Sequence, residues 1–216
     1  FAGLGGDVKY VKSELEGAWY HGFNKDFKLS LTGSAGYIFG FSGDKVRIND
    51  RFYKGGATFR GFETAGVGPR DTTNGTDDPL GGKLYAIGAV ELQVPTFIPE
   101  QYGIRAALFT EFGTVGQLDD DLLSYRVGDL DCVTPTITVP APTPADPNAT
   151  TKVSNFAVPG TRNACIRDDL SLRASAGVSI FWRSPMGPIR FDISQVLAKE
   201  DYDKTETFRF STSARF

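Results

Sequence analysis

The side chains best suited to chemistry in this sequence lie in residues 58–63, which read Thr-Phe-Arg-Gly-Phe-Glu. Arg60 stands between Phe59 and Phe62, whose rings favour burial, and Gly61 indicates a tight turn or a close backbone approach. Arginine keeps its charge in proteins, so a buried Arg60 would need an acidic partner elsewhere in the chain. The alternative is a surface β-turn that carries aromatic residues, and the hexapeptide alone does not decide between them.

Few other residues point to chemistry. His21 is the single histidine of the 216 residues, which argues against a histidine-rich metal site and against a Ser-His-Asp set. Residues 119–121 are three aspartates that would bind a cation or form a solvated acidic loop. The formal net charge of −3 gives no indication of nucleic-acid binding. We therefore expect a protein that is not an enzyme, with no catalytic residues, no metal and no cofactor.

Arg60 lies in a long connection, residues 38–82, between two segments in which apolar and polar residues alternate. An alternation with a period of two predicts a half-buried β-strand. The same pattern predicts seven strands, at residues 7–20, 27–37, 84–94, 104–112, 172–183, 189–194 and 208–216. The sequence therefore predicts an all-β fold.

The connections between these strands differ in length in a regular way. Short turns alternate with the long segments 38–82 and 116–169 and the medium segment 197–206, so all short turns lie at one end of the sheet. Outer-membrane barrels have short periplasmic turns and longer outer loops. A soluble sandwich also alternates apolar and polar residues, but its loops need not sort by length. No apolar run approaches the ~18 residues of a membrane helix.

This pattern favours an antiparallel transmembrane β-barrel over a soluble sandwich. The polar face of most strands carries charges or serines, and the other face is apolar with aromatic residues near its ends. Bacterial single-chain barrels have an even number of strands, and open edges cannot be satisfied in lipid. We therefore expect residues 1–216 to be the C-terminal part, about seven strands, of a larger barrel.

Several sequence blocks resemble one known family. Phe59-Arg60-Gly61-Phe62, followed by Gly68-Pro69, is similar to the Val/Ile-Arg-Gly-Phe motif of the BamA family of outer-membrane barrel-assembly proteins. Further similar blocks follow in the same order, at residues 80–82 (Leu-Gly-Gly), 91–95 (Glu-Leu-Gln-Val-Pro), 111–115 (Glu-Phe-Gly-Thr-Val), 184–191 (Ser-Pro-Met-Gly-Pro-Ile-Arg-Phe) and 208–216. The resemblance covers nearly the whole chain.

The resemblance implies a barrel of about 16 strands in the outer membrane of a Gram-negative bacterium. Its first strands and the periplasmic repeats that precede it are not in this sequence. It also implies that the protein folds and inserts other β-barrels without nucleotide hydrolysis. The implied partners are unfolded outer-membrane protein clients, accessory lipoproteins of an assembly complex and outer-membrane lipid. In such a barrel 38–82 is a motif loop inside the lumen and 116–169 is a long extracellular loop.

The resemblance also implies that Arg60 meets acidic residues on the inner wall, and the matching residues are Glu91 and Glu111. Parity supports this assignment, because both lie on the polar faces of their strands. A forked guanidinium group could bridge both carboxylates. Alternatively, one carboxylate pairs with Arg60 and the other offsets the charge of a lumenal arginine such as Arg105. The motif either takes part in insertion or only stiffens the barrel.

Two positions depart from the family pattern. Phe59 stands where Val or Ile is usual, which changes the bulk of an apolar position. Ser213 stands where a glycine that lets the last strand kink is common, which puts a glycine-dependent opening in doubt.

The last strand and the cysteines give two further expectations. Phe208, Phe210 and Phe216 would face lipid on a strand that closes the barrel, either as an ordinary closing strand or as a seam that templates client strands by edge pairing. Cys132 and Cys165 lie in the same outer loop, where an oxidising compartment would favour a disulfide, unless they are unrelated thiols.

Two other functions remain open from the sequence. A secretion pore or a paralogous assembly factor of the same superfamily would carry the same blocks. A passive porin-like channel would use the lumenal charges to tune permeation. The substrate range distinguishes these alternatives, and the sequence does not show it.

Overall fold

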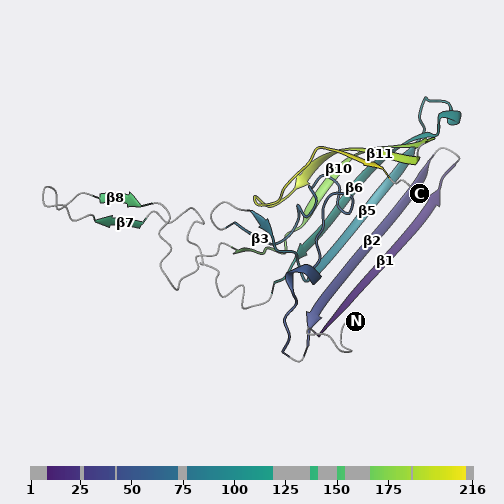
Figure 1. Ribbon diagram of the computed structural model, residues 1–216. Helices are drawn as coiled ribbons and strands as arrows, with labels where there is room; N and C mark the ends of the chain where they lie inside the picture. Colours follow the sequence, from purple (N-terminus) through teal and green to yellow (C-terminus); the bar gives the residue numbers. More distant parts are fainter. Residues whose placement is uncertain are drawn as a thin grey trace.

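The computed structural model describes residues 9–24, 27–41, 43–72, 77–118, 137–140, 150–153, 166–185 and 187–212. Seven strands form one antiparallel sheet whose order follows the chain (Figure 1). They are β1 (Tyr10–Gly22), β2 (Lys28–Gly40), β5 (Leu84–Val94), β6 (Ile104–Gly116), β10 (Arg173–Ser184), β11 (Gly187–Ala198) and β12 (Phe208–Thr212). The predicted all-β fold and its seven long strands are confirmed.

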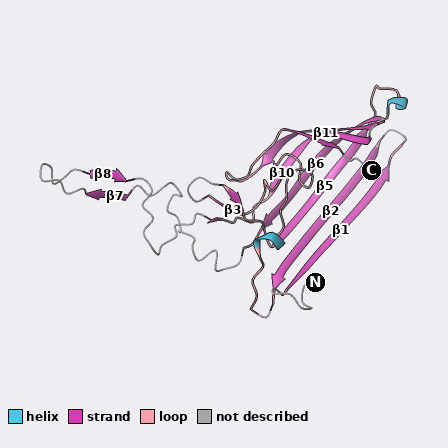
Figure 2. Cartoon of the chain, viewed as in Figure 1, coloured by secondary structure: helices cyan, strands magenta, loops and turns pink. Residues whose placement is uncertain are grey.

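The remaining elements are short. In the described part of the chain, the helical segments are the 3₁₀ turns η1 (Ile48–Asp50) and η3 (Glu100–Tyr102) (Figure 2). Within those same residues, no helix has the length and apolar character needed to cross a membrane. The connections between the long strands contain two small sheets. They are β4 (Asp78–Pro79) with β3 (Arg70–Asp71) and β9 (Ile166–Arg167), and β7 (Ile137–Pro140) with β8 (Thr150–Val153).

Strands β2 and β6 are longer than the sequence predicted at the ends that carry the long connections. β2 continues to Gly40, because its pairing with β1 runs on to Tyr10, and the two connections become residues 41–83 and 117–172. The second connection also contains strand β9, which pairs with β3 of the first through Arg70 and Arg167. The alternation pattern missed these additions because the pairs are short and join distant parts of the chain.

The two faces of the sheet differ in composition. Leu15, Leu108 and Phe210 on one face are 76%, 48% and 53% exposed, whereas Ser175 and Ser179 on the other face are fully buried. This sheet has apolar residues on its outer face and polar residues on its inner face. That arrangement is the reverse of the one in a water-soluble protein, and it is typical of a membrane barrel wall.

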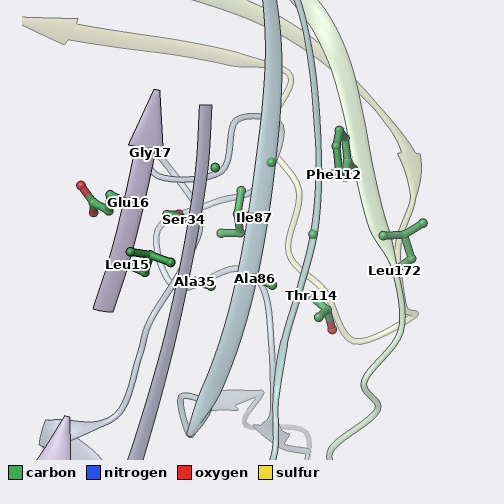
Figure 3. Close-up of a pocket in the computed structure, with 13 residues that line it drawn as sticks. Leu15, Glu16, Gly17, Ser34, Ala35, Ala86, Ile87, Phe112, Thr114 and Leu172 are labelled. Carbon is green, nitrogen blue, oxygen red and sulfur yellow. The ribbon is translucent and has the colours of Figure 1, made fainter. Parts of the chain in front are cut away.

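The outward face has a shallow apolar hollow of about 650 Å³ near its middle. Figure 3 shows it lined by small side chains between Leu15 and Phe112. Glycines follow one another across three strands in the pairs Gly17–Gly33 and Gly33–Gly88. The ring of Phe112 lies over Gly88, where an added Cβ would be 2.8 Å from it. The missing side chains leave this part of the outer surface recessed.

The hydrophobic core lies between the inner face and the long connection 41–83, which crosses that face (Figure 1). The phenylalanines of the connection pack against residues of β2, β5 and β6, at the ends of these strands that carry the long connections. The buried cluster contains Ile38, Val46, Phe52, Phe59, Phe62, Val67, Tyr85, Ile87 and Val115. The connection is therefore a packed element of the fold, and it carries the Arg60 motif to the wall.

Candidate functional site

The Phe-Arg-Gly-Phe motif forms a tight turn that depends on glycine. Gly61 has a φ of +91°, a conformation that residues with a side chain rarely adopt. A Cβ on Gly61 would lie 2.9 Å from the Cβ of Ser175 and 3.2 Å from a methyl group of Val196. The amide of Gly56 donates to the carbonyl of Phe62 at 2.7 Å and closes the turn. Backbone conformation and close approach to β10 and β11 both require Gly61.

The turn places Arg60 against two glutamates of neighbouring strands. Nε of Arg60 donates to Oε1 of Glu111 at 2.5 Å, and the backbone amide of Arg60 donates to Oε2 of Glu111 at 2.7 Å. Nη1 of Arg60 donates to Oε2 of Glu91 at 2.8 Å. The structure therefore brings Arg60, Glu91 and Glu111 together, with both carboxylates on one guanidinium group. In the described residues neither carboxylate forms an ion pair with Arg105.

Strand β10 supplies further contacts that sequence reasoning missed. Nη1 of Arg60 also donates to Oγ of Ser179 at 3.0 Å, and Oγ of Ser175 donates to the carbonyl of Arg60 at 2.6 Å. The guanidinium carbon lies 3.6 Å from the ring centroid of Phe109, in cation–π geometry. Ser175 and Ser179 are fully buried on the inner face. The alternation of apolar and polar residues along this strand was the available sequence signal for their orientation.

A polar network extends from Arg60 towards the other end of the sheet. Ser179 donates through Oγ to the Oδ1 of Asp192, and the same carboxylate oxygen accepts from Nε of Arg190 at 2.8 Å. Nη2 of Arg190 also reaches Oγ of Ser179, at 3.3 Å. Arg60, on the loop, is thus connected by way of one buried serine to an ion pair on β11.

Burial makes this network sensitive to the loss of any member. Arg60 is 5% exposed, and the side chains of Glu111 and Glu91 are 9% and 26% exposed. Removing one partner of a buried ion pair costs about 3–5 kcal/mol, because the remaining charge is uncompensated. Glu111 makes two contacts with Arg60 and is less exposed to solvent than Glu91, so Glu111 is the principal partner of Arg60.

The two phenylalanines of the motif hold the turn in the core. Phe59 and Phe62 are both fully buried, with ring centroids 4.9 Å apart and ring planes at 60°. Phe59 packs in the main hydrophobic cluster, so the larger side chain at this position is accommodated there.

The motif also contacts the connection that leads into β12. Three backbone hydrogen bonds of 3.0 Å join the two segments, from Glu63 to Lys204, from Lys204 to Gly66 and from Glu206 to Gly61. Phe62 and Thr205 form a β-bridge. The sequence predicted residues 197–206 only as a connection, and the pairing partner of such a segment has no sequence signal. The turn that carries Arg60 is therefore joined to the last strand.

A second buried arginine lies in the same region. Arg173, at the start of β10, is fully buried and pairs through Nε with Oδ2 of Asp203 at 3.0 Å. Its other nitrogens donate to the carbonyls of Asp169 and Ser171 at 2.9 and 3.1 Å and to the hydroxyl of Tyr202 at 3.1 Å. Burial raises the pKa of Tyr202 to about 12, although the neighbouring Arg173 opposes this. Sequence analysis did not single out this cluster.

The other predicted site residues are only partly described. Phe208 and Phe210 lie on the outer face of β12 and are 58% and 53% exposed. Phe216, Ser213, Cys132 and Cys165 lie outside the described residues, and so do residues 119–121. Among the residues that the structure describes, no group of three His, Cys, Asp or Glu side chains could hold a metal ion.

Comparison with known proteins decides the family. Residues 1–216 match the Omp85 superfamily domain. The chain belongs to the Omp85 superfamily. The outer membrane protein assembly factor BamA of Neorickettsia risticii (strain Illinois) is 32% identical to this Omp85 chain over 217 residues, 100% of the chain and 23% of the relative. BamA of Neisseria meningitidis serogroup B is 26% identical over 219 residues, 98% of the chain and 24% of the relative.

A second group of relatives matches half of the Omp85 chain. The human sorting and assembly machinery component 50 homolog is 36% identical over 114 residues, which are 50% of the chain and 23% of the relative. The crystal structure of BamA from Haemophilus ducreyi lacking POTRA domains 1–3 has the same fold, with a TM-score of 0.72 at 22% identity. The structural match covers 96% of this chain and 35% of the Haemophilus ducreyi chain.

These matches confirm the resemblance to the BamA family and the class of antiparallel transmembrane β-barrel. They also confirm the predicted location in the outer membrane of a Gram-negative bacterium. The chain spans about a quarter of the length of the two bacterial relatives that it matches along almost its whole length. The named relatives are assembly factors, which agrees with the expectation that the protein is not an enzyme.

Proposed function

We propose that this chain is the C-terminal part of the barrel of an assembly factor that folds and inserts β-barrel proteins into the outer membrane, without nucleotide hydrolysis. The observation that carries the proposal is the similarity to BamA of Neorickettsia risticii over the whole chain. The blocks that carry that resemblance include the motif whose Arg60 contacts Glu91 and Glu111 in the structure. The proposed partners are unfolded outer-membrane protein clients, accessory lipoproteins and outer-membrane lipid.

The geometry supports a specific role for the motif loop, residues 38–82, in the lumen. Arg60 binds the wall at β5 and β6, while the backbone of residues 61–66 binds the connection before β12. A change in the position of the turn would therefore move the start of the last strand. We propose that the motif sets the position of this strand, which forms the seam where client strands pair and whose Phe208 and Phe210 face lipid.

A reconstitution assay tests the proposal. The full-length protein in lipid vesicles should convert an unfolded client barrel into a protease-protected form with no nucleotide present, and Arg60→Ala should lower the yield. A requirement for nucleotide, or ion conductance with no client insertion, would contradict the proposal, and the second result would favour a passive channel. A disulfide engineered across the seam should stop insertion while the barrel stays folded. Unimpaired insertion by the locked protein would refute lateral opening.

A dedicated secretion pore or a paralogous assembly factor is the second candidate, because the superfamily match alone does not distinguish it. The number of periplasmic repeats in the full-length protein, together with the range of clients that it inserts, would separate this candidate from a general assembly factor. Translocation of one soluble partner into vesicles, with no insertion of barrels, would favour it.

A further inference from the structure

The inner face has a second polar region, at the end that carries the short turns. A hollow of about 500 Å³ lies there between β5 and β12. Three arginines line it: Arg105 on β6, Arg183 on β10 and Arg190 on β11. The hollow adjoins the Arg60 site through Glu91, whereas the Arg60 turn itself lies nearer the long connections.

The sheet register fixes the arrangement of these arginines. Arg105 pairs across strands with Phe181, and Phe181 pairs with Arg190, so the three residues lie in a single row across β6, β10 and β11. The guanidinium carbon of Arg190 lies 5.0 Å from the ring centroid of Phe181. Adjacent strands are about 4.8 Å apart, which puts the two arginine backbones roughly 10 Å apart.

Only one of the three arginines in this hollow forms an ion pair in the described residues. Arg190 has an acidic partner, Asp192. Arg105 and Arg183 are exposed, and within the described residues neither side chain has a carboxylate within ion-pair distance. One carboxylate, that of Glu91, lines the hollow, but it accepts from Arg60. Because Arg60 is shared between Glu91 and Glu111, Glu91 offsets part of this charge, and the hollow keeps a net positive charge beside an aromatic ring.

We propose that this arginine hollow binds an acidic, extended segment of polypeptide on the inner side of the barrel. Carboxylates complement Arg105 and Arg183, and an apolar side chain between them would pack on Phe181. Alternate residues of an extended chain point to the same side at a spacing of about 6.6 Å. The hollow opens on the inner face, away from the lipid-facing surface, which favours a polypeptide over a lipid headgroup.

The proposal rests on the proposed function only for the source of the segment, an unfolded client that enters at this end. The test therefore measures binding without insertion. The full-length protein in detergent is titrated with a fluorescent peptide of alternating Asp and Phe, and with a matched peptide of alternating Asn and Phe. Fluorescence anisotropy should show at least tenfold tighter binding of the Asp peptide, and this difference should shrink at high salt.

Variants locate the binding. The double variant Arg105→Gln with Arg183→Gln should lose the preference for the Asp peptide, whereas Arg105→Lys with Arg183→Lys should keep most of it. Lys199→Gln, at an exposed lysine near the long connections, removes a charge elsewhere and should change nothing. The electrophoretic mobility of the unheated barrel reports whether each variant is folded. Where the double Gln variant fails to fold, the single variant Arg105→Gln provides the comparison.

Three results would overturn the proposal. They are equal affinity for the two peptides, unchanged binding by the folded Gln variant, and displacement of the Asp peptide by phosphatidylglycerol vesicles at the same arginines, which would assign the hollow to lipid. A protein that binds the peptide but inserts no client would keep this inference and refute the proposed function. One that inserts clients without binding the peptide would do the reverse.

Discussion

Two buried arginines attach loops to the inner wall of this barrel segment, and they do so in opposite directions. Arg60 comes from the loop and reaches acidic residues on the strands, Glu91 and Glu111. Arg173 comes from a strand and reaches acceptors in the connections, including Asp203 and Tyr202. If the motif loop leaves the wall, Arg60 moves with it. If the connections that contact Arg173 move, Arg173 stays on the wall.

The difference indicates different roles. Arg60 sits on a turn that requires glycine and is joined to the segment before β12, so release of Arg60 would change the position of the last strand. Arg173 lies at the base of two connections and makes four polar contacts there, of which two are to backbone carbonyls. We expect Arg60 to matter for activity and Arg173 to matter for the stability of the loop end.

The largest effect is expected from Arg60→Ala. It leaves the buried Glu111 without its cation, which costs about 3–5 kcal/mol of loop attachment. Limited proteolysis should cut the connection 41–83 much faster, and client insertion should fall. Arg60→Lys should rescue only part of both, because lysine lacks the planar fork that contacts two carboxylates. Full activity together with a released loop would show that the motif only stiffens the barrel.

Arg173→Leu should destabilise the loop end by a similar amount, because the buried carboxylate of Asp203 is left without its cation. Proteolysis of residues 199–207 should increase, while the cutting rate in residues 55–66 changes less. Client insertion by the folded fraction should stay close to wild type. A loss of insertion as complete as that of Arg60→Ala, with a protected motif loop, would remove the distinction between the two arginines.

The two glutamates should not be equivalent. Glu111→Gln removes the charge that receives both Nε and the amide of Arg60, whereas Glu91→Gln affects one contact of a more exposed side chain. The hydrogen-exchange protection of the motif loop should fall about tenfold more in Glu111→Gln than in Glu91→Gln, which corresponds to about 1.4 kcal/mol. Equal protection factors in hydrogen exchange of the motif amides would contradict this ranking.

The sequence could predict the Arg60 site because every part of it has a local signal. Alternation placed Glu91 and Glu111 on the inner face, and the motif block supplied Arg60 and Gly61. The strand ladder was also predictable, since a one-residue shift would move apolar side chains to the wrong face. The ends of the long strands and the boundaries of the connections differed, and the short strands within the connections were not predicted.

The Arg173 cluster could not be predicted in the same way. Its partners come from two connections without periodicity, and a Tyr-Asp pair in a charged loop usually indicates a solvated surface. The bonds from residues 61–66 to residues 204–206 are made by the backbone, so they leave no pattern of residue types. Contacts of this kind depend on how the loops pack on the wall, which the composition does not encode.

The smallest expected effect concerns pH. Burial raises the pKa of Tyr202 to about 12, above the ordinary value of 10.0. The folded state thus holds this proton more tightly than the unfolded state, so the contribution to stability is full below pH 10 and is lost between pH 10 and 12. Tyr202→Phe should remove one late-titrating tyrosinate from the ultraviolet titration, with Tyr102→Phe as the matched control. A titration that is unchanged above pH 11 would show that Tyr202 is not buried.

The central claim is that Arg60 holds the loop to the wall through Glu111, and a double-mutant cycle between them tests it most directly. Arg60→Ala, Glu111→Ala and the double variant are compared by the protease sensitivity of the connection 41–83 in the folded full-length protein. The structure predicts that the double variant is no more sensitive than the worse single variant, with a coupling energy of about 2–3 kcal/mol. Additive effects would mean that Arg60 is held by other groups, and they would contradict the account.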